Sequence, residues 1–119
     1  MKKDLVIAVT GTRSRLGRAL VPRLRAEGHT VVPVPTDYGL IPGSDVLIHL
    51  GAGSRRLAAR LPDAVGLPET LLTTGPRMRA AAALGIHVTP LELRRLRPDE
   101  ATDLILWALR LLENRLCLD

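Results

Sequence analysis

The feature that most constrains the fold is an uninterrupted apolar segment near the start of the sequence, followed at once by a glycine turn. Residues 5–9 read Leu-Val-Ile-Ala-Val, which is typical of a strand buried on both faces of a parallel sheet. Residues 10–12, Thr-Gly-Thr, break this run. From residue 15 to residue 27 apolar residues recur at helical spacing, and Gly28 ends the pattern. The segment therefore predicts the first half of a β-α-β unit.

The same alternation continues along the rest of the sequence. Further strands are expected at residues 30–34, 45–50, 69–74 and 86–89, and further helices at residues 54–61, 77–84 and 98–116. Strands that alternate with helices form parallel sheets covered on both faces. The predicted fold class is therefore α/β: a three-layer, doubly wound, five-stranded parallel sheet of the Rossmann/flavodoxin-like kind, in the order 2-1-3-4-5.

Length and composition are typical of one globular domain, which we expect to span residues 1–119. The 119 residues are 46% hydrophobic, and no apolar run approaches the roughly 20 residues that a membrane span needs. The single cysteine, Cys117, excludes an internal disulfide and a cysteine-based zinc site, and we expect no metal site. We expect a soluble, cytoplasmic protein, for which a partner chain would have to supply any separate substrate domain.

The positive charge is placed at expected strand ends. The sequence has 17 Lys and Arg against 12 Asp and Glu, and its only lysines are Lys2 and Lys3. The turns after the first, third and fourth expected strands carry six arginines, together with glycines and hydroxyl residues: Arg13, Arg15, Arg55, Arg56, Arg77 and Arg79. Helix N-termini disfavour cations, whereas glycine allows close approach and the arginine fork suits phosphate or carboxylate. We expect an anionic small-molecule ligand here; the alternative is that these arginines only solvate the helix starts.

Two segments resemble a known family. Residues 9–20, Val-Thr-Gly-Thr-Arg-Ser-Arg-Leu-Gly-Arg-Ala-Leu, resemble the phosphate-binding turn of the short-chain dehydrogenase/reductase superfamily, TGxxGxxG or TGxxxGxG. Residues 43–53 look like the next landmark of its extended members, such as nucleotide-sugar epimerases. The resemblance covers about residues 4–54 and implies NAD or NADP along the strand ends. With the anion-site argument it gives these candidate cofactor-binding residues: Gly11, Thr12, Arg13, Ser14, Arg15, Leu16, Gly17, Asp37, Gly51, Ala52, Gly53, Arg55, Gly75 and Arg77.

Three charged residues bear on the kind of dinucleotide. Asp37 follows Gly17 by about 20 residues, the spacing at which an acidic residue meets the ribose hydroxyls in dinucleotide-binding domains. The alternative reading of Asp37 is a turn residue beside Tyr38. Arg13 and Arg15 could instead hold a 2′-phosphate, which would favour NADP over NAD.

The sequence departs from the family at two places. The middle glycine of the turn, which lets the backbone approach the pyrophosphate, is Ser14 in one alignment and Arg15 in the other. In the family, the catalytic tyrosine is followed four residues later by lysine. Here the residue four positions after Tyr38 is Pro42, and no lysine comes after Lys3. We therefore expect a nucleotide-binding module without the usual hydride-transfer pair, or an enzyme completed by dimerisation.

A second resemblance covers residues 74–86, which are similar to the VGxxTAxALxxxG stretch of uroporphyrinogen-III synthases. Those enzymes act on a carboxylate-rich linear tetrapyrrole, for which an arginine rim would be suitable, and they place the active site between two domains. A single-domain relative that acts on a polycarboxylate is therefore an alternative function. A noncatalytic interaction subunit is a third.

Histidine and cysteine offer few further candidates. His49 is interpreted as a hydrogen-bonded core histidine, with a general acid or base as the alternative. His29 and His87 have no partners at metal-ligand spacing, and Cys117 is expected to be inert.

The last helix is expected to bury one stripe of apolar residues: Ala101, Leu104, Ile105, Ala108, Leu111 and Leu112. Leu106, Trp107, Leu109 and Leu116 add more apolar surface than one sheet face covers, which predicts a homodimer or another partner through this helix. The alternative is that Trp107 covers a sheet edge. Nucleic acid is disfavoured, because the charge does not form one helix stripe and aromatic residues that could stack bases are lacking.

Overall fold

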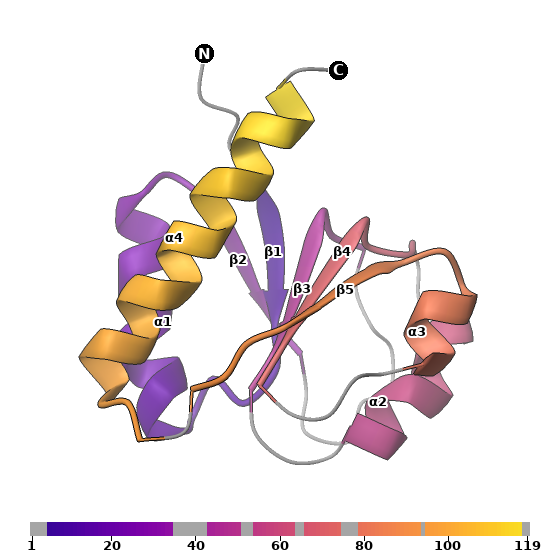
Figure 1. Ribbon diagram of the computed structural model, residues 1–119, viewed down its shortest axis with the longest axis horizontal. Helices are drawn as coiled ribbons and strands as arrows, with labels where there is room; N and C mark the ends of the chain where they lie inside the picture. Colours follow the sequence, from indigo (N-terminus) through magenta and orange to yellow (C-terminus); the bar gives the residue numbers. More distant parts are fainter. Residues whose placement is uncertain are drawn as a thin grey trace.

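The computed structural model describes residues 5–34, 43–50, 54–63, 66–74, 79–93 and 95–117 (Figure 1). The elements are β1 (Val6–Val9), α1 (Arg15–Ala26), β2 (Thr30–Pro33), β3 (Val46–His49), α2 (Ser54–Arg60), a short 3-10 helix (Leu61–Asp63), β4 (Thr70–Thr73), α3 (Arg79–Ala83), β5 (His87–Pro90) and α4 (Pro98–Cys117). Each expected strand and helix is present, with ends that differ by at most two residues from the expected ones.

The strands form one five-stranded parallel sheet in the order β2-β1-β3-β4-β5. This confirms the predicted α/β class, the parallel pairing and the strand order. β2 lies at an edge of the sheet and ends at Pro33, a position that suits proline because proline cannot donate to a ladder. β1, β3 and β4 are the interior strands, and all four residues of β3 and of β4 are buried.

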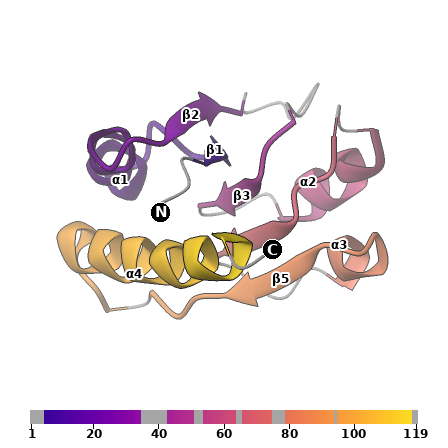
Figure 2. The ribbon, with the colours of Figure 1, turned by 90° about the horizontal axis from the view of Figure 1, so that it is seen from above.

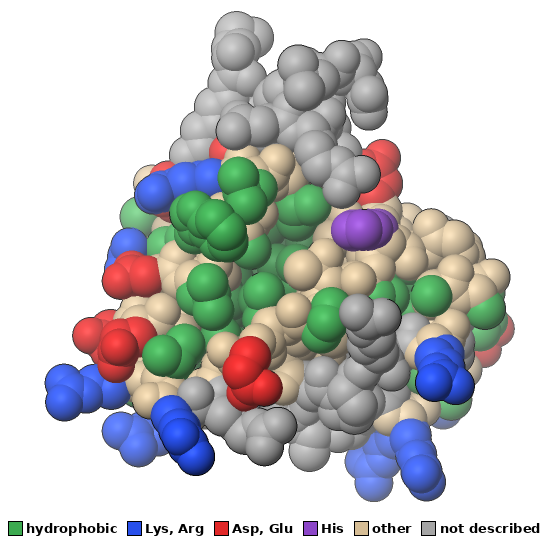
Figure 3. All heavy atoms as spheres, viewed as in Figure 1, with side chains coloured by type: hydrophobic (Ala, Val, Ile, Leu, Met, Phe, Trp, Pro, Cys, Tyr) green, Lys and Arg blue, Asp and Glu red, His purple; other side chains and the backbone are tan. Residues whose placement is uncertain are grey.

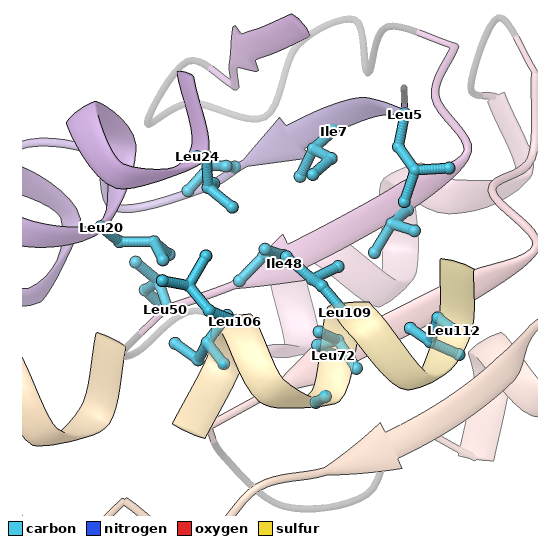
Figure 4. Close-up of a cluster of buried hydrophobic side chains, with 14 residues drawn as sticks. Leu5, Ile7, Leu20, Leu24, Ile48, Leu50, Leu72, Leu106, Leu109 and Leu112 are labelled. Atoms are coloured by element: carbon cyan, nitrogen blue, oxygen red, sulfur yellow. The ribbon is translucent and has the colours of Figure 1, made fainter. Parts of the chain in front are cut away.

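Helices cover both faces of the sheet, which gives three layers (Figure 2). α1 and α4 lie on one face and α2 and α3 on the other. Because side chains alternate along each strand, Ile48 and Leu72 belong to the core under α1 and α4, whereas Leu47 and Leu71 belong to the core under α2 and α3. Figure 4 shows leucines of α1 and α4 pointing toward the sheet in the first of these cores.

Local signals explain where α1 begins and ends. Ser14 is the N-cap, and its Oγ accepts a hydrogen bond from the Gly17 N–H at 3.0 Å. The helix ends before Gly28, whose φ of 93° is readily adopted only by glycine. Pro22 lies inside the helix without interrupting it; its missing N–H leaves the Arg18 carbonyl without the usual helical donor.

The buried side of α4 differs in part from the expected stripe. Ala101, Ile105, Ala108 and Leu112 are buried as predicted, and Leu104 is half-buried. The prediction for Leu111 is wrong, since its exposed fraction is 48%. Leu106 and Leu109 are buried instead. The reason is that α4 packs against α1 as well as against the sheet, which turns its buried arc toward α1. The unburied apolar surface is therefore smaller than predicted.

Polar pairs also join α1 and its following turn to α4. Arg23 contacts Asp103 at 3.4 Å and Glu27 contacts Arg110 at 2.7 Å, both on the surface. Beyond them, His29 Nε2 lies 2.9 Å from Glu113 Oε1, with both side chains almost fully buried. Within the ranges described above, no helix is both long and apolar enough to cross a membrane.

Candidate functional site

The carboxyl ends of the three interior strands meet at one edge of the sheet. Thr10 follows β1; its N–H donates to the Ile48 carbonyl at 2.9 Å, and its Oγ1 accepts from the Leu50 N–H at 3.0 Å. Thr74 follows β4, and its N–H donates to the His49 carbonyl at 3.1 Å. The strand order reverses between β1 and β3, because the chain passes from β1 to β2 on one side and returns to β3 on the other. Ligands of open α/β sheets bind at such a point.

The residue after Thr10 in the β1–α1 turn must be glycine. Gly11 has a φ of 67°, a conformation that other residues rarely adopt. A Cβ at Gly11 would lie 2.7 Å from the Leu50 carbonyl oxygen and 3.2 Å from the Leu50 Cβ. The turn after β1 is therefore packed directly against the end of β3, at the point where the strand order reverses.

Gly17 brings the first turn of α1 against the same segment. A Cβ at Gly17 would overlap the Gly11 carbonyl oxygen and lie 2.7 Å from the Thr12 Cα. These neighbours are backbone atoms, so a rotamer change cannot make room for a larger residue. Gly11 and Gly17 thus have the two structural roles that the outer glycines have in phosphate-binding turns: one for the tight turn and one for close helix packing.

In the TGxxGxxG alignment, Ser14 takes the position of the middle glycine. Its Oγ donates to the Gly11 carbonyl at 2.6 Å and accepts from the Gly17 N–H at 3.0 Å. The hydroxyl therefore links the start of the turn to the first turn of α1. The backbone N–H groups of Arg15 and Leu16, the next two residues, have no acceptor within the described part of the chain. The turn therefore offers two backbone donors beside an exposed serine side chain.

Arginines surround this end of the sheet without acidic partners. No carboxylate of the described residues lies within ion-pair distance of the exposed side chains Arg13, Arg15, Arg55, Arg56 and Arg79. The first turns of α1, α2 and α3 also contain no acidic residue. On the face seen in Figure 3, basic side chains stand at the lower end of the molecule, where α1 and α4 begin in Figure 1. Positive charge and helix N-termini therefore occur together near these strand ends.

His49 lies under this edge, inside the core. Its side chain is fully buried, and Nδ1 lies 2.8 Å from the Thr10 Oγ1. Burial lowers the pKa of His49 below its ordinary value of 6.5, so the ring is neutral at pH 7. The interpretation of His49 as a hydrogen-bonded core histidine is confirmed. The candidate list omitted Thr10, although a threonine between a buried strand and a glycine turn was the available signal.

Some of the candidate residues lie within the described ranges and others do not. The seven from Gly11 to Gly17 are continuous and form the β1–α1 turn and the first turn of α1, and Arg55 lies in the first turn of α2. Asp37, Gly51, Ala52, Gly53, Gly75 and Arg77 lie outside the described residues. The candidate assignment of all these residues to a ligand stays a prediction. Among the residues that the structure describes, no group of three or more His, Cys, Asp or Glu side chains could hold a metal ion.

No protein-family model and no curated protein matches the chain. A nucleoside-diphosphate sugar epimerase from Corynebacterium glutamicum has a solved structure that is similar, with 23% sequence identity and a TM-score of 0.44. The match covers 60% of this chain and 22% of that one, so this chain spans about a fifth of the epimerase structure. The assignment of the α/β fold rests on the order and direction of the strands themselves.

Proposed function

We propose that the chain binds an anionic ligand of the nucleotide class, with a phosphate group at the β1–α1 turn. The observation that carries the proposal is the backbone geometry of Gly11 and Gly17. Both positions exclude a side chain for steric reasons, and both lie where the strand order reverses. A turn of this kind presents backbone N–H groups to a phosphate at close range.

The donors available to a phosphate are of two kinds. The N–H groups of Arg15 and Leu16 belong to the first turn of α1, where the helix dipole also favours an anion. The guanidinium groups of Arg13 and Arg15 are exposed beside them and can donate in pairs to phosphate oxygens. A ligand that extends from this turn along the strand ends would approach Arg55 at the start of α2. This arrangement suits an elongated ligand with a phosphate at one end.

NADP and NAD fit the turn in part. Gly11 and Gly17 have the required geometry, and Arg13 and Arg15 would suit the extra phosphate of NADP. Ser14 differs, because its side chain stands where a glycine would let a pyrophosphate reach the backbone. A bound dinucleotide would therefore have to contact the Ser14 hydroxyl. A mononucleotide places its phosphates at the turn alone, so it needs less room beside the Ser14 side chain.

Thermal unfolding with added ligands tests the proposal. Probes are NADPH, NADH, ADP, inorganic pyrophosphate and citrate, each at up to about 100 times its dissociation constant, which would stabilise the folded chain by about 2.7 kcal/mol. We expect the nucleotides to raise the unfolding temperature more than citrate does. If citrate alone raises it, the site takes polycarboxylates and the nucleotide proposal is wrong. If no probe raises it, both ligand classes are excluded.

Two arginine variants test where the ligand binds. Arg15→Ala is expected to abolish the phosphate-dependent shift, because it removes a charge-assisted donor at the turn. Arg25→Ala is the matched control: it removes an exposed arginine from the last turn of the same helix. A shift that survives Arg15→Ala, or that Arg25→Ala removes equally, would exclude the β1–α1 turn as the phosphate site.

A further inference from the structure

The side of α4 that faces away from the core carries an apolar surface. Trp107 is 58% exposed and Leu111 is 48% exposed, while Leu104 beside them is half-buried. We call these three residues the α4 strip. Figure 3 shows hydrophobic side chains gathered over α4 on this face of the molecule. Trp107 is the chain's only tryptophan, and buried tryptophans often dominate the energetics of protein interfaces. The α4 strip is therefore a candidate contact surface.

Charged residues border the α4 strip on one flank, and the exposed Glu100 lies about two turns before Trp107. Asp103 and Arg110 are exposed on the flank nearest α1, where they pair with Arg23 and Glu27. At 3.6 residues per turn, Leu104 and Leu111 fall on the opposite flank of the helix. Trp107 lies between the two flanks. Between Asp103 and Leu111 the face thus has one charged side, one apolar side and an aromatic residue at its centre.

The order of these residues is self-complementary. Asp103 comes four residues before Trp107 and Arg110 three after it, whereas Leu104 comes three before and Leu111 four after. In an antiparallel helix pair with a two-fold axis beside Trp107, each flank meets the same flank of the second helix in reverse order. Asp103 would then face Arg110 of the partner subunit, and Leu104 would face Leu111 of the partner subunit. Opposite charges meet on one flank and apolar residues on the other.

We propose that this chain forms a two-fold symmetric homodimer in which α4 packs antiparallel against α4 of a second copy, centred on Trp107. The charges favour a second copy over other occupants. A uniformly basic or acidic peptide would be attracted by only one of the two charged residues, whereas a two-fold axis matches both. The charge row would extend across the dimer from Arg23 and Asp103 to Arg110 and Glu27 of the partner subunit, with alternating signs. α4 is about 30 Å long at 1.5 Å per residue, which gives room for the contact.

Mass and fluorescence measured together test the proposal. In sedimentation equilibrium between about 1 and 200 µM, we expect the mass to rise from 12.9 kDa toward twice that value. Over the same range the emission of Trp107 should shift to shorter wavelength and become less accessible to iodide, because the contact removes the ring from water. A monomer throughout, or a dimer in which Trp107 stays accessible, would overturn the proposal.

Substitutions at two exposed apolar residues locate the contact. Trp107→Glu should raise the dissociation constant of the dimer at least about 30-fold, as expected for the loss of a central aromatic contact. Leu67→Glu is the matched control, because Leu67 is 45% exposed but lies between the short 3-10 helix and β4. Circular dichroism should show both variants folded. Equal loss of the dimer in both, or a dimer that survives Trp107→Glu, would exclude the α4 strip.

Mixing two charge variants tests the antiparallel arrangement directly. Asp103→Arg chains and Arg110→Asp chains should each dimerise weakly, because like charges meet at both contacts. An equimolar mixture should restore the dimer, because each chain then offers the charge that the other lacks. The pairs within each chain cannot explain this rescue, since mixing leaves Arg23 and Glu27 beside the substituted residues. A mixture that dimerises no better than either variant alone would contradict the proposed geometry.

Discussion

Single backbone positions define the candidate site more sharply than any side chain does. Gly11 and Gly17 are excluded from carrying a Cβ by backbone atoms of the same turn and of β3. The glycine pattern of the sequence predicted this turn, because the spacing of Gly11 and Gly17 is a backbone property. The hydrogen bonds of Ser14 could not be predicted in this way, because a serine at that position can face a ligand or close the turn.

Gly17→Ala is expected to lower the free energy of unfolding by roughly 3 kcal/mol, since the added methyl overlaps backbone atoms that cannot move aside. Gly43→Ala is the control. Its added Cβ would lie 3.8 Å from the nearest backbone atom, the Gly66 nitrogen, which is an ordinary van der Waals contact. Urea unfolding monitored by circular dichroism measures both. Similar stability of the two variants would show that the contact of α1 with the turn is looser than described.

His49 gives the folded chain a predictable dependence on pH. Because burial lowers its pKa below 6.5, the unfolded chain binds this proton at a higher pH than the folded chain does. The contribution to the free energy of unfolding is full above the unfolded pKa. It falls by up to about 1.4 kcal/mol per pH unit as the pH drops below that value.

The test of this pH dependence is a comparison with His49→Asn, which keeps a polar group near the Thr10 Oγ1 but removes the titration. Urea unfolding between about pH 5 and pH 8 should show a weaker decline at low pH in the variant than in the native sequence. All other titrating groups are common to both chains. Identical pH profiles would mean that His49 accepts its proton equally well in the folded and unfolded states.

At the scale of elements, α1 and α4 behave as one layer held by apolar and polar contacts together. Their leucines share one core, and the pairs Arg23–Asp103, Glu27–Arg110 and His29–Glu113 follow the line of contact. The 3.6-residue periodicity predicted that α4 exists and that Ala101, Ile105 and Leu112 are buried. It could not predict that Leu111 is exposed, because periodicity does not say which second element the helix packs against.

Of these contacts, the buried pair is expected to be the most costly to break. The Leu5 N–H donates to His29 Nδ1 at 3.2 Å, so the ring proton is on Nε2 and is donated to Glu113. His29→Leu should cost about 3–5 kcal/mol, because it leaves a buried carboxylate and a buried N–H without partners. Arg23→Ala, at an exposed pair, should cost about 0–1 kcal/mol.

A double variant separates the lost pair from the lost packing. His29→Leu combined with Glu113→Leu should recover part of the loss, because no uncompensated carboxylate then remains in the core. Calorimetric or urea unfolding of the single and double variants measures the coupling. A double variant as unstable as the sum of the two single variants would show that the two side chains act independently.

At the scale of the whole molecule, charges of both signs lie at the carboxyl ends of the strands. Exposed arginines without acidic partners lie in the β1–α1 turn and at the starts of α2 and α3, and Asp99 and Glu100 lie in the first turn of α4, which follows β5. The strand order and the layers were predictable, because short apolar runs alternating with helices leave few topologies. The identity of the ligand was not predictable, because arginines and helix N-termini attract any anion.

The effect of salt should differ between ligand affinity and the stability of the folded chain. Binding of ADP or NADPH at the arginine-rich end is expected to weaken several-fold between about 50 and 500 mM NaCl, since exposed charges are screened over a few ångströms at high ionic strength. The free energy of unfolding without ligand should change little, because the core is apolar. Isothermal titration measures the first and urea unfolding the second. Affinity independent of salt would argue against a phosphate held by exposed arginines.

The ties between α4 and the start of the sheet have a consequence for folding during synthesis. The Leu5 N–H at the start of β1 is bonded to His29, and His29 is bonded in turn to Glu113 near the end of α4. The apolar face of α1 is likewise covered by leucines of α4. A ribosome-bound chain that has not yet released α4 therefore exposes Leu20 and Leu24 and leaves His29 without its carboxylate. Leu5, Leu20, Leu24 and His29 therefore reach their final environment only after α4 has been synthesised, and until then this half of the sheet is open to chaperones.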